Sequence, residues 1–230
     1  MNLFSYGNES NQKWIIVDMG VTFADDSIPG IDLIYPDPGF IIDKKDDLLG
    51  IVLTHAHEDH IGAIAHIWPQ IKCKIFSTPF TAALIREKFK EKRIDIGNSL
   101  KIVDLNGTVD LKPFKIEFIT LTHSILEPNG LKIETPAGNI LHTGDWKCDP
   151  NPLIGEKIDS KRLKDIGPTI LDFGFIHCDA TYDVMPVYNG KAFCYERHLQ
   201  RFKNSAKRYG LLLPDHEWAD PLEITRQLAK

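Results

Sequence analysis

The chain has 230 residues, 43% of them hydrophobic, which is enough for a globular protein with a full core. The formal net charge of -5 at pH 7 is mildly acidic and does not indicate a nucleic-acid binder, so charge alone says nothing about the substrate. No run of about 18 apolar residues could span a membrane, and the N-terminus lacks a signal-peptide pattern, so we expect a cytoplasmic protein without membrane contact.

Predicted strands and helices alternate along the chain. Strands are recognised as short apolar runs between turn residues, and helices by apolar residues at helical spacing. Strands are predicted at residues 13–18, 32–35, 50–53, 73–77, 100–105, 114–122, 131–135, 139–142, 169–178 and 211–213. Helices are predicted at residues 63–68, 79–93 and 191–209, within 155–165, and from residue 220. This interleaving indicates sheets covered by outer helices, an α/β fold of several layers.

The strongest functional signal directly follows the predicted strand at residues 50–53. Three histidines and two carboxylates lie within six positions: His55, His57, Glu58, Asp59 and His60. Because alternate side chains of extended backbone point the same way, His55 and His57 can bind one ion, and Asp59 and His60 can bind a second. Imidazole and carboxylate ligands favour zinc, with manganese or iron as alternatives. For Glu58, the role of a solvent-facing or locally paired acid explains its presence at least as well as direct metal binding does.

Three more candidate residues follow predicted strands: Asp18, His123 and Asp145. Because functional residues collect on loops at one end of a sheet, these side chains are expected to meet the histidine-rich loop. We predict the following sites: His55, His57 and His123 on one ion, Asp59 and His60 on the other, and Asp145 bridging both. Asp18 is expected to accept the remaining N–H of a ligand histidine and so fix its tautomer. The candidate catalytic residues are therefore Asp18, Asp59 and Asp145.

Two divalent ions about 3.5 to 4 Å apart can bring the pKa of bound water towards neutrality and stabilise charge on the group under attack. The arrangement therefore indicates a hydrolase.

The ordered motifs HAHEDH, a later His123 and HTGD resemble the metallo-β-lactamase superfamily, and longer stretches resemble its ribonuclease J family, in the β-CASP branch. Those stretches are GIDLIYPDPGF, GIVLTHAHEDHIGAI, STPFTAALI, THSILEPNGLKIETPAGNILHTGDWKCDP and CDAT. The resemblance implies a four-layer αβ/βα sandwich with two zinc ions, manganese being possible. It also implies hydrolysis of RNA, by endonucleolytic cleavage and by 5′-to-3′ exonucleolytic trimming, in RNA processing and decay.

The resemblance adds three further candidate residues. Ser124 matches the second residue of the family's HS pair and is expected to shape the loop, and Asp179 in CDAT aligns with the acidic residue that opens the β-CASP region. His216, in PDHEW, is the candidate to replace a zinc-ligand histidine that the family supplies from later in its sequence.

The chain also departs from the family pattern, because an N-terminal strand with a Gly-rich turn and most of the β-CASP region have no counterpart in it. We therefore expect a chain truncated at both ends, with a metallo-β-lactamase-like catalytic domain at residues 1–181 and an atypical helical tail at 182–230. Such a chain is expected to form a homo-oligomer or to need a complementary domain.

Three functions remain open: a ribonuclease J-like enzyme, a metallo-β-lactamase-fold hydrolase of a small ester, thioester or lactone, or a truncated paralogue impaired in catalysis.

Overall fold

The computed structural model describes residues 1–8, 10–24, 30–147, 149–158 and 162–163, and the backbone of three further short strands. The chain divides into two units, Met1–Asp172 and Phe173–Lys230. In the second unit the described elements are β13 (Val187–Tyr188) and β14 (Lys191–Ala192), which pair antiparallel. Among the described helices, none has the length and apolar character needed to cross a membrane.

The first sheet of unit 1 is five-stranded, in the order β1-β2-β5-β6-β7. Its strands are β1 (Asn2–Tyr6), β2 (Lys13–Val17), β5 (Leu48–Val52), β6 (Ile75–Ser77) and β7 (Leu100–Ile102). β1 pairs antiparallel with β2, and the other pairs are parallel. Because β2 and β5 are parallel neighbours with Val17 opposite Val52, the residues that follow them emerge together at one edge of the sheet.

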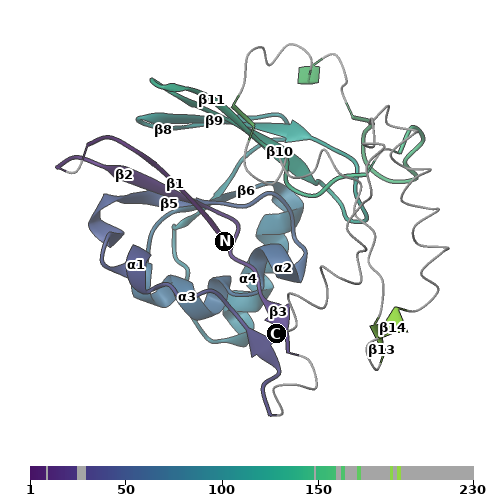
Figure 1. The fold of residues 1–230 in the computed structure, drawn as a ribbon, viewed down its shortest axis with the longest axis horizontal. Coiled ribbons are helices and arrows are strands. Elements are labelled where there is room, and N and C mark those ends of the chain that lie inside the picture. The colour runs from purple at the N-terminus through teal and green to yellow at the C-terminus, as the bar shows by residue number, and fades with distance from the viewer. Residues whose placement is uncertain are drawn as a thin grey trace. The chain divides into compact units, whose positions relative to one another are not determined.

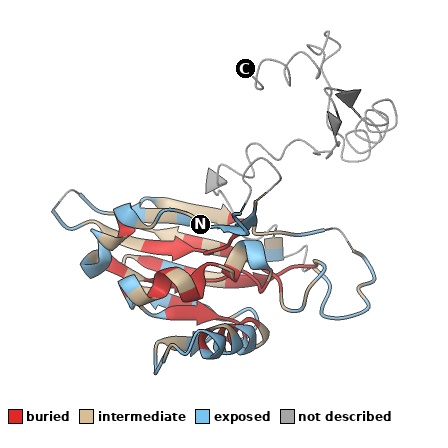
Figure 2. Cartoon of the chain, turned by 90° about the horizontal axis from the view of Figure 1, so that it is seen from below, coloured by how far each residue is buried: buried red, intermediate tan, exposed pale blue. Residues whose placement is uncertain are grey.

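Helices cover one face of this sheet, as Figure 1 shows. They are α1 (Gly39–Ile42), α2 (Glu58–Ile61), α3 (Ile64–Ile71) and α4 (Pro79–Glu91), with a 3-10 turn at Lys45–Asp47. The apolar sides of α3 and α4 pack with alternate residues of the strands into one core cluster, which includes Ile16, Ile51, Ile67 and Phe89. Figure 2 shows buried positions, in red, along the central strands and on parts of the helices.

The second sheet packs against the other face of the first. Its order is β12-β11-β10-β9-β8. Its strands are β8 (Thr108–Leu111), β9 (Phe114–Thr120), β10 (Asn129–Thr135), β11 (Gly138–His142) and β12 (Ile170–Leu171). Val17 and Val52 of the first sheet share a core cluster with Ile116, Phe118 and Leu131 of the second. The α/β prediction is confirmed, and the described residues supply three successive layers of the expected sandwich: helices, sheet and sheet.

The predicted elements differ from the observed ones mainly at their ends. The predicted strands at 73–77 and 100–105 are shorter, at Ile75–Ser77 and Leu100–Ile102. Local patterns did not indicate three of the observed strands: β1, β8 and β3 (Thr22–Phe23). β3 pairs with β4 (Leu33–Ile34), which lies within the predicted strand at 32–35. β1 lies at a sheet edge and is only half-buried, so its sequence shows no strict alternation.

The predicted helix at 191–209 is wrong at its first two residues, because Lys191–Ala192 form β14. The rest of that helix, most of the predicted strand at 169–178, and the elements at 211–213 and from 220 lie outside the described residues. The domain boundary at residue 181 stays a prediction.

Candidate metal centre

Histidine and carboxylate side chains from both sheets meet at one end of the sandwich. Two groups of possible ligand atoms each lie within 4.8 Å of one another: His55, His57 and His123, and His55, His60 and Asp145. His55 and His57 follow β5, and His60 is in α2. His123 follows β9, and Asp145 follows β11. Strand ends far apart in the sequence therefore converge at one place, as predicted.

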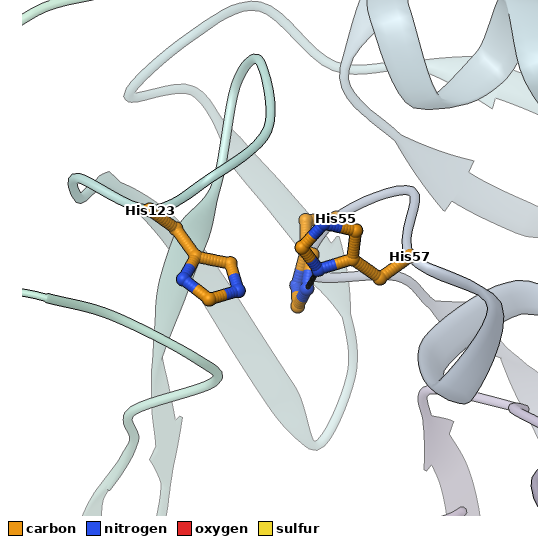
Figure 3. A group of neighbouring side chains, drawn as sticks. All are labelled: His55, His57 and His123. Carbon is orange, nitrogen blue, oxygen red and sulfur yellow. Dashed lines mark hydrogen bonds between the residues drawn. The ribbon is translucent and has the colours of Figure 1, made fainter.

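The three-histidine group is tightly packed. Nε2 of His55 lies 3.0 Å from Nδ1 of His57. The centroid of the His123 ring lies 5.2 Å from that of His55 and 4.8 Å from that of His57. Figure 3 shows the His123 ring facing the other two across the space between their loops. His55 is fully buried. Three imidazoles that face one another in a half-buried space form a donor set that suits zinc.

Asp145 belongs to the second group and also lies near His123 of the first. Its Oδ2 is 3.5 Å from Nε2 of His60 and 3.8 Å from Nε2 of His123. Asp59 is largely exposed, and its Oδ2 lies 3.6 Å from Nε2 of His60. Asp59 is not a member of either close group, and its exposed carboxylate borders the second group at His60.

Asp18 contacts the histidine-rich loop through two hydrogen-bond partners, Thr54 and His60. Its carboxylate is buried and accepts the backbone N–H of Thr54 at 2.8 Å, and its Oδ2 lies 2.8 Å from Nδ1 of His60. Burial raises the pKa of Asp18, but hydrogen bonds from His142, His60 and Thr54 outweigh burial and hold the pKa far below its ordinary value. A carboxylate that is ionised here accepts the Nδ1–H of His60 and leaves Nε2 facing Asp145.

The histidines of the centre have divergent pKa values. Burial lowers the pKa of His60, but hydrogen bonds to Asp145 and Asp18 outweigh it and raise the pKa to about 10. Burial, reinforced by the charge of His60, lowers the pKa of His55 to about 3. Burial also lowers the pKa of His123. Without an ion, His60 is therefore doubly protonated and positively charged at neutral pH, whereas His55 and His123 are neutral.

The turn after β2 lies against the ligand loop. The backbone N–H of Met19 donates to the His60 carbonyl at 2.6 Å, and that of Val21 donates to the Glu58 carbonyl at 3.0 Å. A Cβ atom at Gly20 would lie 1.6 Å from the Asp59 carbonyl oxygen. This close approach explains why a glycine stands between the Asp18 strand end and α2.

Gly20→Ala is therefore expected to lower the free energy of unfolding by at least about 3 kcal/mol, because backbone cannot yield as a side chain does. Urea denaturation measures this value. Gly97→Ala is the matched control, since Gly97 has nothing within 4 Å and a φ of 52°, so that variant should cost only about 1 kcal/mol of backbone strain. Equal losses in the two variants would contradict the close approach.

The His123 loop is tied to two other parts of unit 1. Both the backbone N–H and the side-chain Nδ2 of Asn129 donate to the Thr54 carbonyl, at 3.1 and 3.0 Å. The Glu127 carboxylate accepts the backbone N–H of Phe80 at 2.8 Å, in the first turn of α4. These bonds fix the separation between the loop of His123 and the loop of His55.

His142 is a residue of the centre for which the sequence analysis assigned no role. It is buried at the end of β11, with Nε2 3.9 Å from Oδ2 of Asp18, and its ring meets the Phe4 ring edge-on. Its position three residues before Asp145 places it at the same strand end, but its contact with Asp18 arises only in the fold. His142 helps to keep Asp18 ionised.

The remaining candidates have simpler placements. Ser124 is exposed next to His123. Glu58 pairs with Lys88, with oxygen–nitrogen distances of 2.5 and 2.7 Å, which agrees with a locally paired acid. Asp179 and His216 lie outside the described residues.

An α/β sandwich with clustered histidines and aspartates at its strand ends defines a class of metal-binding folds. The metallo-beta-lactamase superfamily model matches residues 8–180, and the chain belongs to this superfamily. The recognised resemblance to ribonuclease J is also confirmed. The ribonuclease J of Sinorhizobium meliloti is 38% identical over 169 residues, which are 73% of this chain and 30% of that protein.

The ribonuclease J of Corynebacterium glutamicum is 37% identical over 215 residues, or 92% of this chain and 29% of that protein. That of Helicobacter pylori is 37% identical over 160 residues, or 69% of this chain and 23% of that protein. The matched part of the chain thus spans less than a third of these relatives.

Proposed function

We propose that the chain is a metal-dependent ribonuclease that hydrolyses RNA phosphodiester bonds in RNA processing and decay. The observation that supports it best is the pair of ligand groups that share His55, in a chain 37–38% identical to proteins named ribonuclease J. Endonucleolytic cleavage and 5′-to-3′ trimming, which the resemblance implies, belong to the same proposal.

The residues fit two divalent ions, with zinc first and manganese second. His55, His57 and His123 would hold one ion, His60 and Asp59 the other, and Asp145 both, since its carboxylate faces His60 and His123. Two ions bound in this way supply an activated water near neutral pH and charge stabilisation at the phosphoryl oxygens. An additional ligand from His216 stays a prediction, as does the role of Asp179 at the opening of the β-CASP region, because both residues lie outside the described residues.

The protein's own groups position the reaction. Asp18 accepts the Nδ1–H of His60 and keeps that ring oriented with Nε2 towards Asp145. Asp59 and Asp145 are partly exposed, so the centre opens to solvent on the side where a polynucleotide can approach. Buried His55 and Asp18 close the opposite side.

Binding of the two ions is expected to release protons unequally. His55 and His123 are neutral at pH 7.5, whereas His60, with its pKa raised to about 10, holds a proton that the second ion must displace. We expect about one proton with the second equivalent and little with the first, and about tenfold weaker second-site binding per unit fall in pH. Calorimetric titration in buffers of different ionisation enthalpy measures the release, and equal release with both equivalents would contradict the assignment.

The function is tested by one assay on the full chain. The protein is loaded with zinc or manganese, its bound metal is measured, and it is given 5′-monophosphorylated and 5′-triphosphorylated RNA beside a small ester. We expect RNA cleavage that His57→Ala and Asp59→Ala remove. His66→Ala is the control, because His66 stacks on Tyr35, with ring centroids 5.4 Å apart, and is outside both ligand groups.

Metal binding without RNA cleavage would overturn the ribonuclease proposal and leave the impaired-paralogue hypothesis, while ester hydrolysis alone would favour the small-ester hypothesis. The oligomeric state is measured on the same sample, because a homo-oligomer or a complementary domain also remains a proposal.

A further inference from the structure

A cavity of about 200 Å³ lies directly beside the metal centre, with His123 in its wall. It opens between the loop that follows β9 and the segment at residues 152–156. A cavity of about 150 Å³ is large enough for a benzene ring, so this one has room for a single aromatic ring system and little more. The metal-ligand assignments do not use this space.

The lining is apolar and has no positive charge. Its walls are formed mainly by Leu105, Leu121, Ile125, Leu126, Pro128 and Ile154. The charged residues that line it are two acids, Glu127 and Glu156, and the Glu127 carboxylate is bonded to the Phe80 backbone. A phosphate group would gain no partner here and would be repelled, whereas a neutral, flat ring could bury its faces against the aliphatic walls.

The rim of the cavity exposes apolar surface beside the metal centre. Leu105 is 41% exposed, Leu126 36% and Ile154 73%, although all three line the same cavity. Apolar side chains left open around a concave site are typical of a ligand-binding surface. The ligand would therefore enter from solvent with one face over these side chains.

Buried polar atoms of the lining residues are also without partners. Oγ1 of Thr120 and Nδ1 of His123 have no hydrogen-bond partner within the described part of the chain. Both atoms are themselves buried, so they form an unsatisfied polar patch just behind the apolar wall of the cavity. A ring with polar edges and apolar faces is the chemistry of a nucleobase.

We infer that this cavity binds one nucleobase of the RNA, that of a nucleotide next to the phosphate held at the metal centre. The inference rests on the proposed ribonuclease function, which supplies a polynucleotide at His123. The site would favour a base over a bare sugar-phosphate and would not select a terminal phosphate, because no cation lines it. Burial of one base against the aliphatic walls is expected to improve affinity about tenfold, through the apolar area removed from water.

Binding is measured on the full zinc-loaded chain with two fluorescent, hydrolysis-resistant phosphorothioate hexamers. One is hexauridylate, and the other has the same backbone without bases. The wild type should bind hexauridylate about tenfold more tightly than the abasic hexamer. Ile154→Glu should abolish this difference, because it places a carboxylate in the rim. Leu153→Glu is the matched control, because this substitution adds the same charge one residue away. Leu153 is fully exposed and does not line the cavity.

A second variant removes the space without a charge. Leu126→Trp fills the rim from a partly exposed position, so it should fold and should also abolish the preference for bases. Equal affinities for the two hexamers in the wild type, or equal effects of Ile154→Glu and Leu153→Glu, would overturn the inference. Loss of ester hydrolysis in Ile154→Glu, with the base preference intact, would also overturn it, since the cavity would then hold an acyl group.

Cleavage of ordinary hexauridylate by the same proteins separates this inference from the proposed function. Cleavage without base preference would leave the ribonuclease function standing and remove the cavity from it. Base preference that Ile154→Glu abolishes, without cleavage, would support the cavity and remove the ribonuclease function.

Discussion

Asp145→Asn is expected to lower the rate of RNA hydrolysis about a thousandfold while leaving the fold intact. The Asp145 carboxylate lies 3.5 Å from His60 and 3.8 Å from His123, so it is the acidic group placed to contact both proposed ions. An amide has the same shape but no negative charge, and it is a much weaker ligand for two cations. Because the side chain of Asp145 is 44% exposed, its replacement should cost little stability.

Three measurements test this expectation: the turnover number on RNA, the bound metal, and the thermal unfolding midpoint. Asp110→Asn is the control, because Asp110 is an exposed aspartate on β8, outside both ligand groups. Activity of the Asp145→Asn protein within a few-fold of the control would remove Asp145 from the proposed centre.

The clustering of these histidines and aspartates was largely predictable because its signals are local and its strands obey simple rules. The loop after β5 shows its histidines in a run of six residues, and parallel pairing of β2 with β5 necessarily brings Asp18 beside Thr54. His123 and Asp145 follow strand ends in the second sheet, which packs against the sheet that contains β2 and β5. Periodicity and the strand-end rule were sufficient for these residues.

Residues whose role depends on tertiary contacts were not predictable. His142 acquires its importance only when β11 ends beside β2, and Glu127 only when its loop meets the first turn of α4. β1 is a half-buried edge strand whose sequence, NLFSY, lacks alternation. The cavity beside His123 joins residues about 50 positions apart, and no local pattern marks it.

Asp18→Asn is expected to lower the free energy of unfolding of the metal-free protein by about 3 kcal/mol, because it leaves a buried charge partner uncompensated. The Asp18 carboxylate is 2.8 Å from Nδ1 of His60 and accepts from Thr54. Its φ of 59° lies in the left-handed region, which asparagine also tolerates, so the variant removes charge without adding backbone strain. Metal affinity should fall as well, since His60 loses the acceptor that orients it.

The loss should depend on pH with a definite sign. The pKa of Asp18 is held below its ordinary value of 3.8, so its contribution is present above about pH 4 and is lost on acidification. The pKa of His60 is raised from 6.5 to about 10, so its contribution is complete below pH 6.5 and disappears as the pH rises towards 10. The difference between wild type and Asp18→Asn should therefore be largest between about pH 4 and 6.5 and smaller at pH 9.5.

Urea denaturation at pH 5.5, 7.5 and 9.5 in the presence of a chelator measures this difference. Asp47→Asn is the control, because it breaks the exposed pair of Asp47 with Lys13, 2.8 Å apart, and an exposed pair contributes about 1 kcal/mol or less. A loss in Asp18→Asn no larger than in this control, or one that grows at alkaline pH, would mean that the ionised Asp18 does not stabilise the protonated His60. The proposed orientation of His60 by Asp18 would then have to be abandoned.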